Sequence, residues 1–136
     1  MGIKSKVVHY KRLAHNFVRD AHTYKTERSS SWPRVEREFL AKNPSCAACG
    51  SMEHLNVHHK MPFHLHPELE LEESNLITLC MSEDRHCHLL IGHGDSFKAY
   101  VPGVESFSKE ALSAYWKNDK EKVAVVVQKA RDSRKV

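Results

Sequence analysis

Residues 44–93 read PSCAACGSMEHLNVHHKMPFHLHPELELEESNLITLCMSEDRHCHLLIGH. This segment holds all four cysteines of the chain, as a Cys-x2-Cys pair and, thirty residues further on, a Cys-x6-Cys pair. A two-residue spacer lets both sulfurs of the first pair reach one zinc ion, and Gly50 permits the tight turn of such a metal-binding loop. The pattern therefore predicts one structural zinc ion with four ligands: Cys46, Cys49, Cys80 and Cys87.

Other interpretations of the cysteines stay open at this point. The spacer of the second pair is wide, so His86 or His88 could replace Cys87 as the fourth ligand. Buried free thiols would leave the turn at Gly50 unexplained. A redox Cys-x-x-Cys protein is disfavoured because no thioredoxin-like pattern of strand and helix surrounds Cys46.

Short patterns of secondary structure surround the cysteine pairs. Leu55 and Val57 alternate with polar residues, which predicts a strand that ends at His58-His59. Residues 62–74 hold two prolines and four glutamates and are interpreted as a loop, after which an apolar run leads to Cys80. Helices are expected at 32–42, at 87–92 with Gly92 as its end, from about 108 with Ser108 as its cap to 117, and from about 119 to 131.

The length of 136 residues predicts one globular unit with tails. We divide the chain into a basic N-terminal arm (1–31) with a weak helix, a core (32–103) and C-terminal helices (104–136). Large aromatic side chains at helical spacing are expected in the core rather than as platforms for nucleobases: Trp32, Phe39, Tyr115 and Trp116.

The net charge of +4 is unevenly distributed. Residues 1–28 carry 7 Lys and Arg against 2 Asp and Glu, and residues 117–136 carry 7 against 3. Residues 29–116 carry 7 against 12. Basic ends around an acidic centre suit a protein whose ends contact a polyanion and whose centre binds cations. Ordinary solvated surface charge is the alternative explanation.

The chain shows no sign of a membrane segment or a secretory signal. Its longest apolar run, Val123 to Val127, is far too short to cross a bilayer, and residues 1–11 lack the apolar stretch of a signal peptide. We therefore expect no membrane association and a cytoplasmic protein with reduced thiols. The sequence does not indicate an oligomeric state.

Several motifs occur in a fixed order within residues 44–93: Cys46-x2-Cys49, Val57-His58-His59, Asn75-Leu-Ile-x-Leu-Cys80 and Cys87-His88. Together they resemble the His-Asn-His (HNH) endonuclease family. The resemblance implies an α+β fold with a zinc-stapled ββα-metal core and flanking N- and C-terminal helices. It also implies a metal-dependent DNA endonuclease that hydrolyses phosphodiester bonds and leaves 5′-phosphate and 3′-hydroxyl ends.

The resemblance also implies roles for single residues. His59 matches the general base, and Asn75 matches the asparagine that fixes the loop and the base through hydrogen bonds. His58 and His88 match the ligands of one catalytic divalent cation. Because both are neutral, Mn²⁺, Ni²⁺, Co²⁺ and Zn²⁺ are candidates beside Mg²⁺. Two further histidines are candidates for the same site: His64 and His93.

A second function from another class fits part of the same sequence. A non-catalytic zinc-binding module that contacts nucleic acid or a protein partner needs the cysteines alone, whereas an enzyme also needs His59. DNA is the partner that we expect in the first case. The target structure, the sequence preference and the biological role are not indicated by the sequence.

Overall fold

The computed structural model describes residues 27–136, so most of the expected N-terminal arm and its helix lie outside the described residues. Two compact units are present. The described part of the first, residues 27–39 with Met61–Asn75, is called the loop unit below. The second comprises Leu40–Lys60 with Leu76–Val136 and is called the cysteine–histidine unit.

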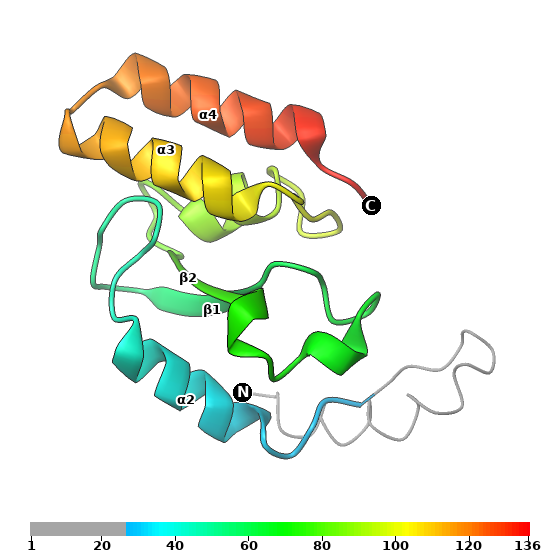
Figure 1. The fold of residues 1–136 in the computed structure, drawn as a ribbon. Coiled ribbons are helices and arrows are strands. Elements are labelled where there is room, and N and C mark those ends of the chain that lie inside the picture. The colour runs from blue at the N-terminus through cyan, green and yellow to red at the C-terminus, as the bar shows by residue number, and fades with distance from the viewer. Residues whose placement is uncertain (1–26) are drawn as a thin grey trace. The chain divides into compact units, whose positions relative to one another are not determined.

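In the loop unit, the chain enters helix α2 (Trp32–Lys42), which confirms the helix expected at 32–42 (Figure 1). The Arg28 guanidinium lies 5.4 Å from the ring centroid of Trp32 and 4.7 Å from that of Phe63. It also pairs with the buried Glu70 at 3.5 Å. The expected loop at 62–74 contains two short 3-10 turns, Pro67–Leu69 and Glu73–Asn75.

The cysteine–histidine unit is built on an antiparallel hairpin of β1 (Leu55–His59) and β2 (Leu76–Cys80). β1 is the strand predicted from the alternation of apolar and polar residues. Every residue of β2 is buried, which agrees with its apolar sequence. The Thr78 hydroxyl donates to the Asn43 carbonyl at 2.9 Å, and the Thr78 carbonyl accepts from Ala47 N at 2.9 Å. These bonds fix the first cysteine loop to β2.

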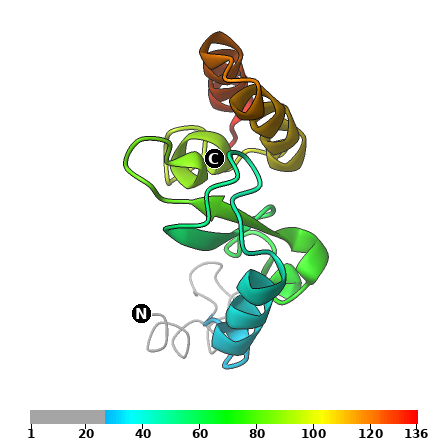
Figure 2. The same cartoon turned by 90° about the vertical axis from the view of Figure 1, so that its left-hand side faces the viewer.

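Three helices complete this unit. A π-helix, η3 (His88–Gly92), contacts the hairpin on one side and the packed pair α3 (Val104–Trp116) and α4 (Lys120–Ser133) on the other (Figures 1 and 2). α4 confirms the last expected helix, and the Asp119 side chain caps it by accepting from Lys122 N at 3.0 Å.

The expected start of α3 at Ser108 is wrong. The helix begins at Val104, four residues earlier, because Val104 is fully buried and Gly103 precedes it as the N-cap residue. Ser108 lies inside α3 with 1% of its surface exposed and caps nothing. Apolar packing decides this boundary, and capping preference does not.

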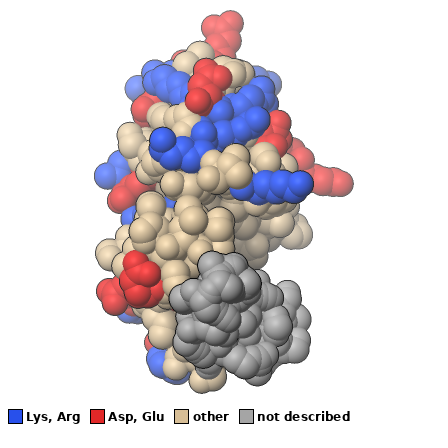
Figure 3. All heavy atoms as spheres, turned by 90° about the vertical axis from the view of Figure 1, so that its right-hand side faces the viewer, with Lys and Arg blue, Asp and Glu red and all other residues tan. Residues whose placement is uncertain are grey.

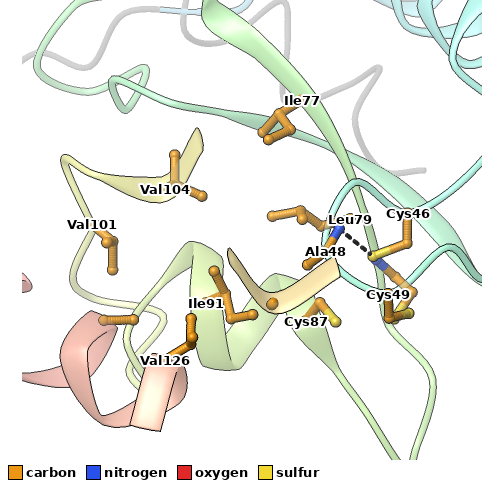
Figure 4. Packing of buried hydrophobic residues seen from close by; sticks show 13 residues of the cluster. Cys46, Ala48, Cys49, Ile77, Leu79, Cys87, Ile91, Val101, Val104 and Val126 are labelled. Atoms are coloured by element: carbon orange, nitrogen blue, oxygen red, sulfur yellow. Dashed lines mark hydrogen bonds between the residues drawn. The ribbon is translucent and has the colours of Figure 1, made fainter. Parts of the chain in front are cut away.

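The core of the cysteine–histidine unit lies between the hairpin, η3, α3 and α4. Leu79, Ile91, Val101, Val104 and Val126 are its largest fully buried apolar side chains, and the four cysteines belong to the same cluster (Figure 4). Tyr115 was expected in the core and packs half-buried against this cluster. Trp116 was also expected there, but that expectation is wrong, since its side chain is 79% exposed. Trp116 is the last residue of α3, where the core ends.

These elements make the described part of the chain a small α+β protein, as expected. No helix within residues 27–136 is both long and apolar enough to cross a membrane.

Candidate functional site

The four cysteines converge on one point of the cysteine–histidine unit. Cys46 and Cys49 lie in the loop before β1, Cys80 ends β2, and Cys87 precedes η3. All four are buried and free of disulfide bonds, and their sulfurs lie within 4.8 Å of one another. Cys87 therefore belongs to the group, and neither His86 nor His88 replaces it.

The spacing of the sulfurs fits a tetrahedral ion. The Sγ atoms of Cys49 and Cys80 are 3.8 Å apart. Zinc–sulfur bonds of about 2.3 Å at the tetrahedral angle separate two sulfurs by about 3.8 Å. The backbone N–H groups of Ala48 and Cys80 donate to Cys46 Sγ at 3.4 Å each, as expected around a thiolate ligand. This cysteine group can hold a structural metal ion such as zinc.

Proton sharing within the cysteine group links the four thiols. Hydrogen bonding with the Cys46 thiol lowers the pKa of Cys49 to about 6 and also lowers the pKa of Cys80. Hydrogen bonding raises the pKa of Cys46, chiefly through Cys49, and the pKa of Cys87, chiefly through Cys46. The hydrogen bonds thus divide the protons unequally among the four thiols, and an incoming cation must displace the protons that remain.

Three histidines form a second group in the same unit: His58 from β1, His88 at the start of η3, and His93 just after η3. Their ring centroids are 4.8–5.0 Å apart. Nε2 of His88 lies 3.3 Å from Nε2 of His93. His58 is 3% exposed, and its Nε2 is buried without a hydrogen-bond partner in the described part of the chain.

Hydrogen bonds on the outer nitrogens orient two of these rings. His93 Nδ1 donates to the Ala99 carbonyl at 2.7 Å, because a carbonyl oxygen can only accept. His88 Nδ1 faces the Met81 thioether sulfur at 3.0 Å, which also can only accept. The Nε2 atoms of both rings therefore carry lone pairs and face each other, which is the arrangement of metal-bound histidines.

The π-helix explains why His93 joins the group. Hydrogen bonds in a π-helix connect residues five apart, so this winding brings His88 and His93 to the same side. Gly92 allows the close approach of η3 to the strand, because a Cβ there would lie 3.0 Å from Leu79 Cδ1 and 3.2 Å from His58 Cε1. His64, the other candidate, is exposed, belongs to the loop unit and is not a member of this group.

All three histidines of the group are neutral near pH 7. Burial lowers the pKa of His58 well below its usual value, lowers that of His88 to about 4 and lowers that of His93. Repulsion from neighbouring histidines adds to the effect at His58 and His88. Three neutral imidazoles with converging nitrogens form a possible site for a divalent ion.

These pKa shifts predict how the protein without an ion in the histidine group responds to acid. Each folded-state pKa lies below the unfolded value near 6.5, so the unfolded chain takes up protons first and stability falls as the pH drops from about 6.5 towards 4. His88 alone contributes about 3 kcal/mol to this loss. Urea unfolding of wild type and His88→Ala at pH 7.5 and pH 5 should show a smaller pH effect in the variant. Equal pH effects would contradict the assignment.

His59 and Asn75 lie outside the histidine group. His59 is the last residue of β1, and since neighbouring strand residues point to opposite faces, its half-exposed side chain lies on the other face from the buried His58. Asn75 belongs to the loop unit, where it accepts from Met61 N at 2.9 Å and donates to the carbonyls of Met61 at 3.1 Å and Leu69 at 3.4 Å. It therefore joins the two ends of the loop that begins two residues after His59.

Removing the Asn75 side chain should loosen this loop. Asn75 is 6% exposed, so Asn75→Ala removes buried hydrogen-bonding atoms from partly buried backbone groups and should destabilise the protein by about 1–3 kcal/mol. Amide hydrogen exchange should accelerate in residues 61–75. Asn56→Ala is the matched control, because Asn56 donates one bond, to the adjacent Leu55 carbonyl. Unchanged exchange in Asn75→Ala would show that apolar packing alone orders the loop.

The chain matches no protein-family model, no curated protein and no solved structure. Fold and geometry therefore define its class as a small α+β protein with two groups of possible metal ligands. The sequence predicted both pairs of cysteines, as well as His58 and His88. It gave only weak indication of His93 and none of the outer-nitrogen partners, Met81 and Ala99.

Proposed function

We propose that this chain is a metal-dependent DNA endonuclease of the HNH type, with the hairpin and η3 as its ββα-metal core. The observation that carries the proposal is the convergence of three neutral imidazoles, with 3.3 Å between the Nε2 atoms of His88 and His93. His59, the residue that matches the family's general base, follows His58 directly in the chain.

The donor set fits a catalytic cation. Metal–nitrogen bonds of about 2.0–2.1 Å at the tetrahedral angle separate two nitrogens by about 3.3 Å, the spacing between His88 and His93. His58, His88 and His93 would hold the ion. Three imidazoles without a carboxylate favour Mn²⁺, Co²⁺, Ni²⁺ or Zn²⁺ over Mg²⁺. When bound, such an ion stabilises negative charge on the phosphate and on the leaving 3′-oxygen.

His59 would act on the attacking water. A half-exposed imidazole that is neutral at physiological pH can accept the proton of a water molecule as that water attacks phosphorus. Asn75 would hold the loop after His59 through its three hydrogen bonds and would transfer no proton. Attack by water with loss of the 3′-oxygen gives 5′-phosphate and 3′-hydroxyl ends.

The alternative, a non-catalytic zinc-binding module, accounts for less of the geometry. Such a module would use the cysteine group alone. It gives no reason for a second group of three histidines in which the buried His58 Nε2 has no hydrogen-bond partner in the described residues. Burial of an unpaired nitrogen costs free energy, which a bound cation would offset.

Ligation of the product tests the proposed function. The protein should nick a supercoiled plasmid in the presence of Mn²⁺, and DNA ligase alone should reseal the nicks because both ends are already suited to ligation. Nicks that are resealed only after kinase or phosphatase treatment would contradict the proposed chemistry.

Lysines at the α3–α4 turn are expected to contribute to DNA affinity. Figure 3 shows the side opposite this turn, where Lys and Arg side chains also gather, with Asp and Glu among them, over the part that carries α3 and α4. Deleting α4 would remove part of the core, since Val126 and Ala130 are fully buried there. Substitution is therefore the appropriate test.

Changing the exposed Lys117, Lys120 and Lys122 together to Gln should weaken DNA binding. It should also flatten the plot of log K against log salt by roughly 0.9 for each lost phosphate contact. Lys129→Gln is the matched control, because Lys129 is paired with Glu110 at 3.0 Å. Identical salt slopes in the triple variant and wild type would show that these lysines are only solvated surface charge.

A further inference from the structure

An exposed aromatic ring lies against the histidine group. Phe97 is 55% exposed, and its ring centroid is 4.9 Å from that of His93 and 5.8 Å from that of His88. The ring thus packs on two proposed metal ligands with part of its surface while the rest remains open to solvent. The open surface of the ring is therefore available to a ligand that reaches the histidine group.

The loop that carries Phe97 is anchored at both ends. Arg134 donates to the Gly94 carbonyl at 2.6 Å, and Arg131 pairs with Asp95 at 3.1 Å. On the far side of Phe97, Tyr100 exchanges two backbone hydrogen bonds of 2.8 Å with Lys135. The end of α4 and the residues that follow it therefore hold the loop, and with it Phe97, in one position. A preorganised binding surface for a ligand needs such anchoring.

Charge identifies the chemistry of the ligand. Lys98 follows Phe97 and is exposed, and Arg134, which anchors the loop, is exposed as well, whereas the charge of Arg131 is paired with Asp95. Cations beside an aromatic ring form the usual surface for single-stranded nucleic acid, in which the backbone follows the charges and a base stacks on the ring. An uncharged apolar ligand would gain nothing from Lys98 and Arg134.

We propose that Phe97 stacks on an unpaired nucleobase next to the scissile phosphate, so that the preferred substrate is DNA with a single-stranded nucleotide at the cleavage site. This inference rests on the proposed function. Bases inside a duplex are stacked on both faces, and a ring on an anchored loop reaches a base only where that base has left the stack. Single strands, flaps and gaps supply such a base, and intact duplexes do not.

Binding measurements in the cleavage-deficient His59→Ala background test the inference without any need for activity. Fluorescence anisotropy would compare a 12-nucleotide oligothymidine with a duplex of equal length, in the presence of Mn²⁺. The variants are Phe97→Ala, Phe97→Leu, which keeps apolar volume on His93, and Phe97→Trp, which keeps an aromatic face. Trp116→Ala is the matched control, since Trp116 is more exposed and lies beside Gly50, away from the histidine group.

Loss of one stacked base should weaken single-strand binding by roughly 5- to 150-fold in both Phe97→Ala and Phe97→Leu. Duplex binding should change less than about twofold, and Phe97→Trp and Trp116→Ala should bind like the parent. In a series of oligothymidines, each with one abasic site at a different position, one oligonucleotide should lack the base that stacks on Phe97. The parent and Phe97→Ala should bind that oligonucleotide with equal affinity. Equal losses for single strand and duplex, or full binding by Phe97→Leu, would overturn the inference.

The two proposals fail separately. If the wild-type protein cleaves no DNA but the Phe97-dependent preference for single strands holds, the endonuclease proposal fails and the stacking platform stands. If intact duplex is cleaved and Phe97→Ala neither binds nor cleaves differently from the parent, the endonuclease stands and the stacking platform is wrong.

Discussion

Replacing His59 by alanine is expected to lower the rate of DNA cleavage by about 10²–10⁴-fold, the usual loss when a general base is removed. His59 is half-exposed at the end of β1 and is not a member of either group of possible metal ligands. Fold, metal content and DNA affinity should therefore remain unchanged. A loss confined to the chemical step is the signature of a proton-transfer role.

The measurement is single-turnover nicking of a supercoiled plasmid at saturating protein and metal. His54→Asn is the matched control, because His54 is an exposed histidine with φ of 56°, a conformation that asparagine tolerates. The control should cleave like wild type. A His59→Ala protein with the wild-type rate would assign the proton transfer to another group.

Loss of the ion from the cysteine group should unfold the cysteine–histidine unit. Structural zinc contributes an apparent free energy of about 10–16 kcal/mol in small zinc-binding domains, whereas a domain of this size is stable by about 5–15 kcal/mol. The four buried cysteines are part of the core itself, in one cluster with Leu79 and Ile91 (Figure 4). A chelator or the Cys46→Ser substitution should therefore abolish cooperative unfolding.

Elemental analysis of purified protein should find about one zinc ion per chain in this group. Ser82→Ala is the matched control, since its hydroxyl lies 3.4 Å from Cys80 Sγ but supplies no ligand in the cysteine group. It should retain zinc and its thermal midpoint. Zinc-free protein, together with an unchanged midpoint in Cys46→Ser, would show that the thiols are merely buried.

Local patterns predicted the parts of the fold that local interactions determine. The alternation around Val57 gave strand β1, helical spacing gave α2, and the Cys-x2-Cys spacing led to the cysteine group. Packing between distant segments decided the rest. α3 starts at Val104 because that side chain fills the core, and Trp116 is exposed because it is the last residue of α3, where the core ends.

The histidine group was only partly predictable for a related reason. A short helix is expected to be α-helical, and residues that share a face of an α-helix are three or four apart. His88 and His93 are five apart, so the π-helical winding before His93 helps to bring them together. The partners of their outer nitrogens, Met81 and the Ala99 carbonyl, are set by tertiary contacts that no motif encodes.

The most direct test of the central claim is plasmid nicking by protein whose histidine group has been emptied and then refilled. Mild chelation that leaves the cysteine-bound zinc in place should abolish nicking, and Mn²⁺, Co²⁺ or Ni²⁺ should restore it in wild type. His88→Ala and His93→Ala, each removing one nitrogen of the 3.3 Å pair, should need far higher metal concentrations for the same rate. Nicking that persists in chelator, or a folded, zinc-loaded protein that nicks no DNA with any of these ions, would contradict the account.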